Sequence, residues 1–193
     1  MKTAIFGGTF DPIHSAHLVV AREAADAFSL DRVLFVPSNR PPHKGAHAPY
    51  EDRYRMVDLA CAADPRFVPS RLEEGQETSY SIHTIERARG LDLPWKRLFF
   101  LIGADAFGEI RTWHRWKEVV ESVEFIVVTR PGHAYVTPAG ATVHRLETVA
   151  LPVSSSEIRQ ALARGETPAE LPPAVAQYIH AHRLYGAVRD TAY

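Results

Sequence analysis

Short apolar runs alternate with amphipathic stretches along this 193-residue chain, and the alternation predicts an α/β fold. Because strand–helix–strand units make right-handed crossovers, we expect a Rossmann-like, doubly wound and mostly parallel sheet with helices on both faces. Near the C-terminus, two helix-like stretches follow each other without an intervening strand. The sequence therefore also predicts a C-terminal helical part.

The predicted strands are short runs rich in β-branched and aromatic residues. They cover Thr3–Phe6, Val33–Pro37, Phe67–Leu72, Arg97–Ile102 and Phe125–Thr129. The stretches between them have helical periodicity. The helices predicted there cover Leu18–Phe28, Glu51–Ala63, Ser81–Arg89 and Arg115–Val120. The two C-terminal helices are expected at Ser154–Ala163 and Pro173–Leu184, ended by Gly165 and Gly186 respectively.

The composition is typical of a soluble globular protein, with 46% hydrophobic and 23% charged residues. A formal net charge of -1 supplies no field that would gather nucleic acid or an anionic membrane. The single cysteine, Cys61, excludes an internal disulfide and a cysteine-rich metal cage. The sequence has neither a signal-like start nor an apolar run of the ~20 residues that span a bilayer. We therefore expect a cytoplasmic protein.

The length is that of one domain. We expect a single domain over residues 1–186 and a frayed tail over residues 187–193. The sequence leaves open whether the protein forms homo-oligomers.

The most informative segment is Gly7–His17, which follows the first predicted strand and leads into the first predicted helix. Two glycines after a strand let the backbone turn sharply and approach a ligand, while the helix start offers free N–H groups to a phosphate. His14 and His17 are three residues apart, so their rings are expected to project toward the same ligand, and phosphate contact favours their charged form. A zinc site is disfavoured, because two further ligands would be needed and the chain lacks H-E-x-x-H and C-x-x-C patterns.

Four further blocks carry residues suited to binding a nucleotide. The proline-rich stretch Pro37–Pro49 is predicted to be an exposed loop that presents Lys44, whose flexible cationic side chain can reach a phosphate. Thr78–Thr84 starts a helix, where backbone N–H groups suit a carboxylate. Ile102–Asp105 leaves a carboxylate at the end of a strand. Val153–Arg159 places serines at a helix start and an arginine one turn later, which suits an anion.

In this order and spacing, the five blocks resemble the HxGH nucleotidyltransferase superfamily and, within it, the bacterial nicotinate-nucleotide adenylyltransferases. The resemblance covers most of the chain, from the first strand to the helix of Arg159. Ala16 stands where the family has glycine, and its methyl group could crowd a nucleotide, although we expect function to survive. His83 stands where the family usually has aspartate, and its role stays open.

The resemblance implies that AMP is transferred from ATP, accompanied by Mg²⁺, to nicotinate mononucleotide, giving deamido-NAD and pyrophosphate in NAD biosynthesis. The residues implied to be catalytic are His14, His17 and Arg159. Those implied to bind ATP are Gly7, Gly8, Thr9, Phe10, Ala16, Gly103, Asp105, Arg130, Ser154, Ser155 and Ser156. Those implied to bind nicotinate mononucleotide are Lys44, Ser79, Tyr80, Thr84, Ile85, Trp113 and His114. The ring of Trp113 is implied to stack on the pyridine, with backbone donors near Thr84, Ile85 and His114 facing its carboxylate. No metal site made by the protein alone is implied.

Two other interpretations remain open. The first is an adenylyltransferase of the same superfamily that acts on nicotinamide mononucleotide or phosphopantetheine. The second is a non-catalytic nucleotide-binding module, which only Ala16 and His83 favour.

Overall fold

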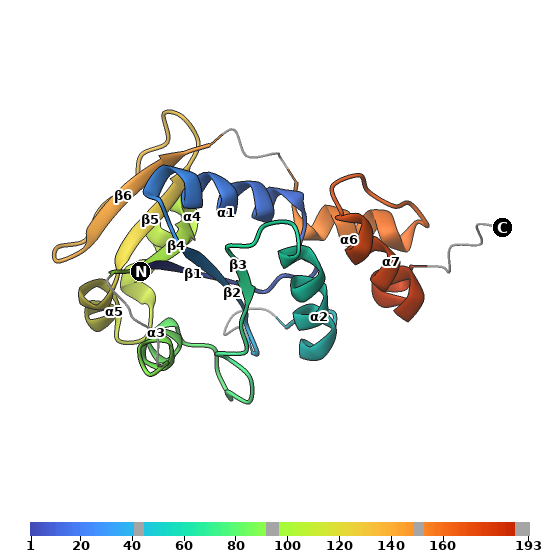
Figure 1. The fold of residues 1–193 in the computed structure, drawn as a ribbon, viewed down its shortest axis with the longest axis horizontal. Helices are drawn as coiled ribbons and strands as arrows, with labels where there is room; N and C mark the ends of the chain where they lie inside the picture. Colours follow the sequence, from blue (N-terminus) through green and yellow to red (C-terminus); the bar gives the residue numbers. More distant parts are fainter. Residues whose placement is uncertain (41–44, 92–96, 149–152, 188–193) are drawn as a thin grey trace.

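The computed structural model describes residues 1–40, 45–91, 97–148 and 153–187 and contains one six-stranded sheet (Figure 1). Every pairing between neighbouring strands is parallel. The strand order is β3-β2-β1-β4-β5-β6. The strands are β1 (Lys2–Gly8), β2 (Arg32–Pro37), β3 (Phe67–Pro69), β4 (Arg97–Gly103), β5 (Glu124–Thr129) and β6 (Thr142–Glu147). The predicted fold class is confirmed, and the sheet is wholly parallel.

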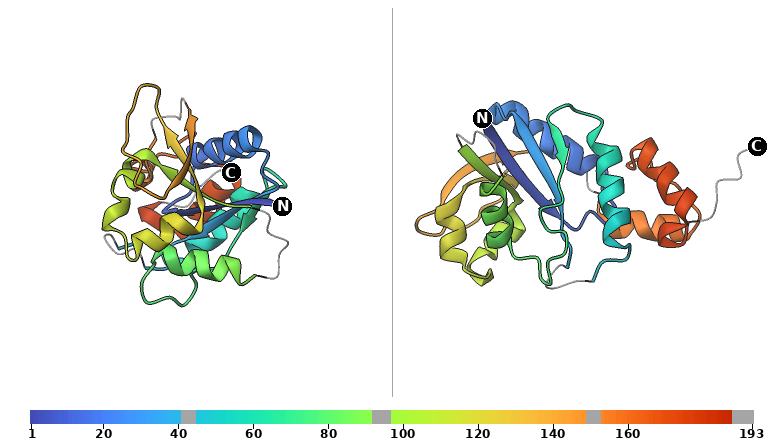
Figure 2. Two further views of the ribbon diagram at one scale, coloured as in Figure 1. Left: turned by 90° about the vertical axis from the view of Figure 1, so that its left-hand side faces the viewer. Right: turned by 60° about the horizontal axis from the view of Figure 1, so that its bottom comes forward.

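Helices lie on both faces of this sheet (Figures 1 and 2). They are α1 (Ser15–Phe28), α2 (Tyr50–Cys61), α3 (Ser81–Arg89), α4 (Ala104–Gly108), α5 (Trp116–Ser122), α6 (Ser155–Ala163) and α7 (Pro173–His182). Two short 3-10 turns, η1 (Ile110–Thr112) and η2 (Leu184–Gly186), complete the described elements. Among the described residues, none of the helices has the length and apolar character needed to cross a membrane.

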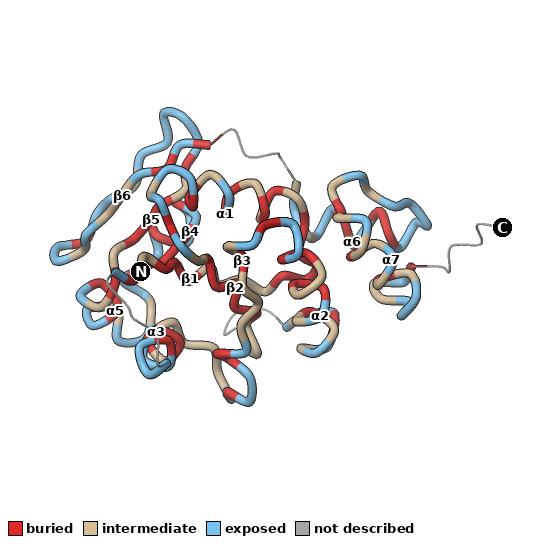
Figure 3. The backbone as a smooth tube through the Cα atoms, viewed as in Figure 1, coloured by how far each residue is buried: buried red, intermediate tan, exposed pale blue. Residues whose placement is uncertain are grey.

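The core has two halves because successive side chains of each strand point to opposite faces of the sheet. Ala4, Phe35 and Phe99 belong to the cluster packed under α1 and α2. Ile5 and Phe100, one residue along their strands, belong to the opposite cluster with α3, α4 and α5. Figure 3 shows that buried residues follow one another along the central strands, whereas many residues of the outer segments are exposed. The continuous apolar runs in the sequence are thus explained by burial on both faces.

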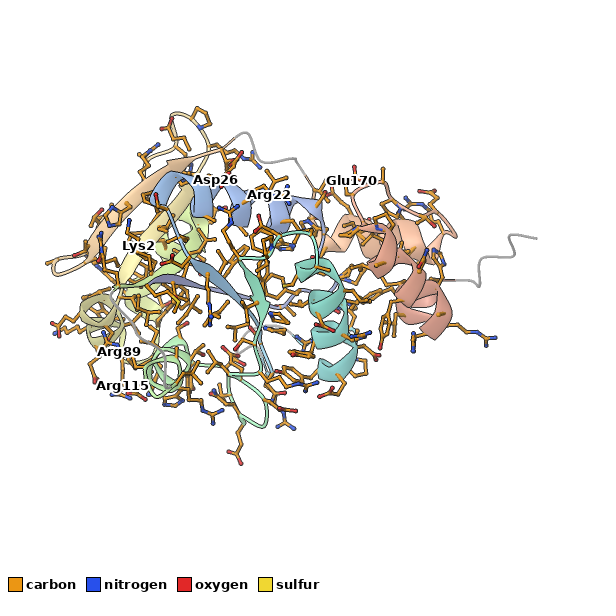
Figure 4. All side chains as sticks on the ribbon, in the orientation of Figure 1. Lys2, Arg22, Asp26, Arg89, Arg115 and Glu170 are labelled. Carbon is orange, nitrogen blue, oxygen red and sulfur yellow. The ribbon has the colours of Figure 1, made fainter. Side chains whose placement is uncertain are left out.

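The C-terminal helices α6 and α7 lie beside α2 (Figure 1) and share the core of α1 and α2. Leu162, Val175 and Ile179 are buried in that cluster. The amide of Ser15, the first residue of α1, donates to the Glu170 carbonyl over 2.8 Å, and Figure 4 places Glu170 between α1 and the C-terminal helices. The predicted helical part is present and is packed against the sheet domain.

Several predicted boundaries were wrong. The third strand ends at Pro69 rather than Leu72; proline has no N–H for a strand ladder, and the chain then turns away. The edge strand β6 and the short helix α4 were not predicted. Gly165 follows α6 with φ 80°, as expected, but α7 ends before Arg183, which adopts φ 53°, and Gly186 closes η2 instead.

The glycines of the opening block lie inside β1 and do not form a turn. Gly7 and Gly8 are absent from the positive-φ residues of the described chain, whereas Phe10 has φ 48°. A Cβ added to Gly8 would lie 3.0 Å from the Phe10 ring. That ring is buried against three others, those of Phe6, His17 and Phe35. The interpretation of these glycines as a sharp turn was therefore wrong, and Gly8 instead leaves room for Phe10 to fold back on β1.

An ion-pair cluster ties the turn between α2 and β3 to α1. The Arg66 guanidinium donates to both carboxylate oxygens of Asp64, at 3.0 and 2.8 Å, and to Asp26 at 2.7 Å. Arg22 reaches the same Asp64 carboxylate at 3.5 Å, and Figure 4 shows Arg22 and Asp26 on α1. The hydrogen bonds from Arg66 hold the pKa of Asp64 well below its usual range.

Gly8→Ala is expected to lower the free energy of unfolding by about 1–3 kcal/mol, because the added methyl meets a buried ring. Gly103→Ala is the matched control, since a Cβ there meets nothing within 4 Å. Its expected change lies within about 0.5 kcal/mol. Urea unfolding of both variants measures the difference, and equal losses would contradict the packing argument.

Asp64→Asn is expected to destabilise the protein at neutral pH and to flatten its acid unfolding. Because the folded-state pKa of Asp64 is lowered, its contribution is complete above its unfolded pKa of about 3.9 and is lost as the pH falls toward the folded-state value. Thermal unfolding of both proteins from pH 7 to pH 2 measures this. A difference between them that does not shrink in acid would rule out the ionic contribution.

Candidate active site

A cavity of about 820 Å³ opens at the carboxyl ends of β1 and β4. These two strands are neighbours at the point where the strand order reverses, with later strands added on the opposite side of β1. Open α/β sheets bind ligands at such switch points. The residues that line the cavity are Ile5, Phe6, Gly7, Gly8, Thr9, Ser38, Glu73, Ser79, Tyr80, Ser81, Thr84, Phe100, Leu101, Ile102, Gly103, Ala106, Glu109, Thr112, Trp113 and His114.

One wall of the cavity carries aromatic rings. Trp113 packs edge-on against Phe100 with ring centroids 6.1 Å apart. Tyr80 and His114 are stacked, with centroids 4.5 Å apart and an interplanar angle of 29°. The His83 ring lies 5.7 Å from Tyr80 and 6.0 Å from His114, outside the lining itself. This wall suits a flat heteroaromatic ring.

The cavity also has an acidic side that the sequence did not indicate. Of the described lining residues, Glu73 and Glu109 carry carboxylates, and none is a lysine or arginine. Glu73 is buried; it accepts from the Thr84 hydroxyl at 2.7 Å and from the Asn39 amide at 3.3 Å. It therefore joins the start of α3 to the segment after β2. Only the tertiary structure brings it here, because its local sequence is that of an ordinary charged turn.

Five of the residues predicted to bind the mononucleotide line the cavity: Ser79, Tyr80, Thr84, Trp113 and His114. Ser79 is also structural, since its amide donates to the Arg40 carbonyl and its hydroxyl accepts from the Arg40 amide, both at 3.0 Å. Lys44 lies outside the described residues.

One of the expected backbone donors, the Thr84 amide, already has a partner inside α3. The side chain of Ile85 is fully buried in the core, and the Thr84 amide donates to the Tyr80 carbonyl at 3.3 Å within the first turn of α3. The first N–H groups of a helix lack partners inside it, and in α3 these belong to Ser81 and Ile82. Of these two residues, Ser81 lines the cavity, whereas the side chain of Ile82 is buried in the core.

His14 and His17 meet at the start of α1, as predicted, with ring centroids 3.8 Å apart. The His14 amide donates to Nδ1 of His17 at 3.2 Å, so Nε2 of a neutral His17 carries the proton and can donate. Nδ1 of His14 is buried without a hydrogen-bond partner among the described residues. The pair therefore retains polar atoms for a ligand.

Burial changes the charge expected of these rings. It lowers the pKa of His14 to about 4, partly opposed by the Glu170 charge. It also lowers the pKa of His17 well below the usual value, and a charged His14 would lower it further. Before a phosphate binds, both imidazoles are neutral at physiological pH. They are uncharged here rather than the imidazolium ions expected from phosphate contact alone.

Arg159 and Ser155 of α6 are tied to the segment before the histidines. Arg159 donates to the Asp11 carbonyl at 2.7 Å and to the Ser156 hydroxyl at 3.1 Å. The Ser155 hydroxyl donates to the Pro12 carbonyl at 3.0 Å. Ser154 caps α6 by accepting from the Glu157 amide at 3.2 Å, so its hydroxyl has a structural task. The start of α6 thus lies against residues 11 and 12.

The remaining predicted ATP-binding residues are spread along the same sheet edge. Gly103 ends β4, and the side chain of Asp105, just beyond it, is 99% exposed. Arg130 follows β5 and is exposed. Ala16 is buried in α1, so little of its methyl group faces a ligand. Phe10 lies beneath the site as a packing residue rather than on its surface.

Two buried charged residues, Asp11 and Arg53, hold the loops around this site, and neither was among the predicted site residues. Arg53 is 1% exposed and donates to the carbonyls of Ala48, Thr9 and Ser38 at 3.1, 2.8 and 2.7 Å. Asp11 accepts from the amides of His47 and Ala48 at 2.7 and 3.1 Å. Burial raises the pKa of Asp11, but these amides and its other donors outweigh burial and keep that pKa below its usual value. A buried arginine on an amphipathic helix gives no sequence signal that separates it from a surface one.

Comparison with known proteins agrees with this geometry. Residues 5–161 match the cytidylyltransferase-like family model. A protein of Solibacter usitatus described as a probable nicotinate-nucleotide adenylyltransferase is 59% identical, and one of Thermus thermophilus with the same description is 43% identical. Each alignment covers 96% of this chain and 100% of the relative.

Solved structures show the same fold at low sequence identity. The Plasmodium falciparum nicotinic acid mononucleotide adenylyltransferase complexed with NaAD has a TM-score of 0.80 and 20% identity, covering 97% of this chain and 98% of that one. The same enzyme complexed with APC has a TM-score of 0.77 at 20% identity and the same coverage. From the family model and the curated relatives, the chain belongs to the cytidylyltransferase-like family and, within it, to the nicotinate-nucleotide adenylyltransferases.

Proposed function

We propose that this protein transfers the adenylyl group of ATP to nicotinate mononucleotide, releasing deamido-NAD and pyrophosphate. The observation that carries the proposal is the pairing of His14 with His17 at the start of α1. This helix follows β1, whose end, Gly7 and Gly8, lines the ring-lined cavity at the switch point of the sheet. The curated relatives are named for this activity.

The reaction needs no nucleophile from the protein. A phosphate oxygen of nicotinate mononucleotide attacks the α-phosphorus of ATP and forms the new P–O bond. The bond from the α-phosphorus to the bridging oxygen of the β-phosphate breaks, and pyrophosphate leaves with that electron pair. The protein contributes alignment of the two nucleotides and stabilisation of the charge that develops on the phosphates.

The two histidines stabilise this charge as neutral donors. Nε2–H of His17 and the His14 ring face the α-phosphate, where a fixed donor in a dry site acts without the cost of burying an ion. The backbone amides of residues 8–10 add further donors at the end of β1. Arg159 and Ser155, held against residues 11 and 12, contact the β- and γ-phosphates.

Mg²⁺ supplies neutralising charge on the triphosphate when ATP is bound. Among the described residues, no group of three histidine, cysteine or acidic side chains is placed to hold a metal ion. The described side chains are therefore suited to an ion that is bound mainly by the ATP phosphates and by water. Asp105 is the exposed carboxylate at the end of β4 that can reach such an ion.

The cavity takes the nicotinate half of the acceptor. Its ring lies against Trp113, and its carboxylate meets the amides of Ser81 and Ile82 at the start of α3. Because Glu73 and Glu109 bring negative charge to the same cavity, neutral backbone donors must carry the recognition of an acid over an amide unless Lys44 contributes. Lys44 is proposed to reach the acceptor phosphate.

Pyrophosphate release with Mg²⁺-ATP and one acceptor at a time tests this function. We expect the highest kcat/KM with nicotinate mononucleotide, lower values with nicotinamide mononucleotide, and none with phosphopantetheine. A preference for either of the last two would reassign the substrate. Absence of release with all three would leave a nucleotide-binding module.

His17→Ala is expected to lower kcat at least about 10²-fold, the loss typical of removing one donor from a charge-stabilising site. His17→Gln keeps a side-chain N–H and is expected to retain more activity than alanine. Steady-state pyrophosphate release measures both, with circular dichroism confirming the fold. Near wild-type turnover in the alanine variant would remove His17 from the mechanism.

A further inference from the structure

We propose that Tyr185, near the C-terminus, is a positioning residue of the active site that acts through the buried carboxylate of Asp11. Its hydroxyl donates to Oδ1 of Asp11 over 2.7 Å, across 174 residues of sequence. The inference rests on the proposed function, because it assigns Tyr185 a part in ordering the residues that bind ATP. None of the sequence blocks described above contains Tyr185.

The Asp11 carboxylate is fully engaged and therefore cannot act on a substrate. It is 3% exposed and accepts four hydrogen bonds. The His47 amide and Nδ1 donate to Oδ2 at 2.7 and 3.1 Å, while the Ala48 amide and the Tyr185 hydroxyl donate to Oδ1 at 3.1 and 2.7 Å. A carboxylate has about four lone-pair sites, so all are used. Asp11 serves as a fixed point between three segments of the chain.

The main chain next to this carboxylate carries the ATP-binding groups. The Asp11 carbonyl accepts from Arg159, and the Pro12 carbonyl accepts from Ser155. His14 follows two residues later. A shift of the Asp11 side chain is therefore passed to Arg159 and Ser155 through hydrogen bonds of 2.7 and 3.0 Å. It is passed to His14 through the intervening main chain.

The turn that delivers Tyr185 is conformationally costly. Arg183, Tyr185 and Gly186 have φ values of 53°, 57° and 76°, in the left-handed region that non-glycine residues avoid. The turn aims the Tyr185 ring at the α1–α2 core and its hydroxyl at Asp11. Burial and the adjacent Asp11 charge raise the pKa of Tyr185, so the hydroxyl keeps its proton and donates.

The chain provides a matched control for a purely structural role. Tyr178, in α7 of the same C-terminal part, donates to Oδ1 of Asp52 on α2 at 2.8 Å. The chemistry and length of this bond resemble those of Tyr185 to Asp11. Asp52, however, is outside the site described above. Tyr→Phe at each position removes one hydroxyl from the same part of the fold.

Tyr185→Phe and Tyr178→Phe are compared with wild type at a temperature where circular dichroism shows all three folded. We expect similar decreases in Tm for the two variants. Only Tyr185→Phe should lower kcat/KM for ATP, by about tenfold, as for the loss of one hydrogen bond to a charged group. The KM for nicotinate mononucleotide should change much less. Wild-type kinetics in Tyr185→Phe, or an equal loss in Tyr178→Phe, would overturn the inference.

Calorimetric titration with Mg²⁺-ATP alone separates this inference from the proposed function. The positioning role stands, whichever acceptor is used, if two results are obtained. The ATP affinity of Tyr185→Phe must be about tenfold lower than that of wild type, and the ATP affinity of Tyr178→Phe must equal that of wild type. Equal ATP affinity in wild type and Tyr185→Phe overturns it. Failure of the proposed function appears separately, as wild-type protein that binds ATP and releases no pyrophosphate.

Discussion

The arrangement of the active site depends on one buried guanidinium, that of Arg53. Its planar set of N–H donors reaches main-chain carbonyls on three segments, at residues 9, 38–39 and 48, which are far apart in sequence. Arginine suits this task because its donors are fixed in one plane and remain charged when buried. Asp11 binds residues 47 and 48 from the other side, so the peptide groups around Ala48 are held by opposite charges.

These two charges are used to shape the site, while the groups proposed to face the substrate are largely neutral. Burial keeps His14 and His17 uncharged, and the first amides of α3 are dipoles. Uncharged donors suit a pocket that must bind polyphosphate and then release pyrophosphate, since they do not require an empty site to bury unpaired cations. Among the charged exceptions, Arg159 and the metal ion carried by ATP are proposed to lie at the phosphates that leave, and Lys44 is proposed to reach the acceptor phosphate.

The sequence predicted the features that depend on neighbours in the chain. The bounds of α3 were predicted without error, and β1 and α1 were placed within a few residues, because apolar periodicity and helix-start residues act locally. The histidine pair was predicted from its three-residue spacing on a helix start. Predictions failed where a distant group decided the outcome. Gly8 leaves room for the buried ring of Phe10, and Glu73 lines the cavity.

By itself the sequence determined the α/β architecture, the position of the histidine pair at the start of α1 and the five blocks that carry the family resemblance. Each of these depends on local patterns of apolar, glycine and polar residues. Only the tertiary structure decided the charge of the histidines, the acidic side of the cavity, and the links among Arg53, Asp11 and Tyr185. Those properties come from desolvation and from hydrogen bonds between residues up to 174 positions apart, which no local pattern encodes.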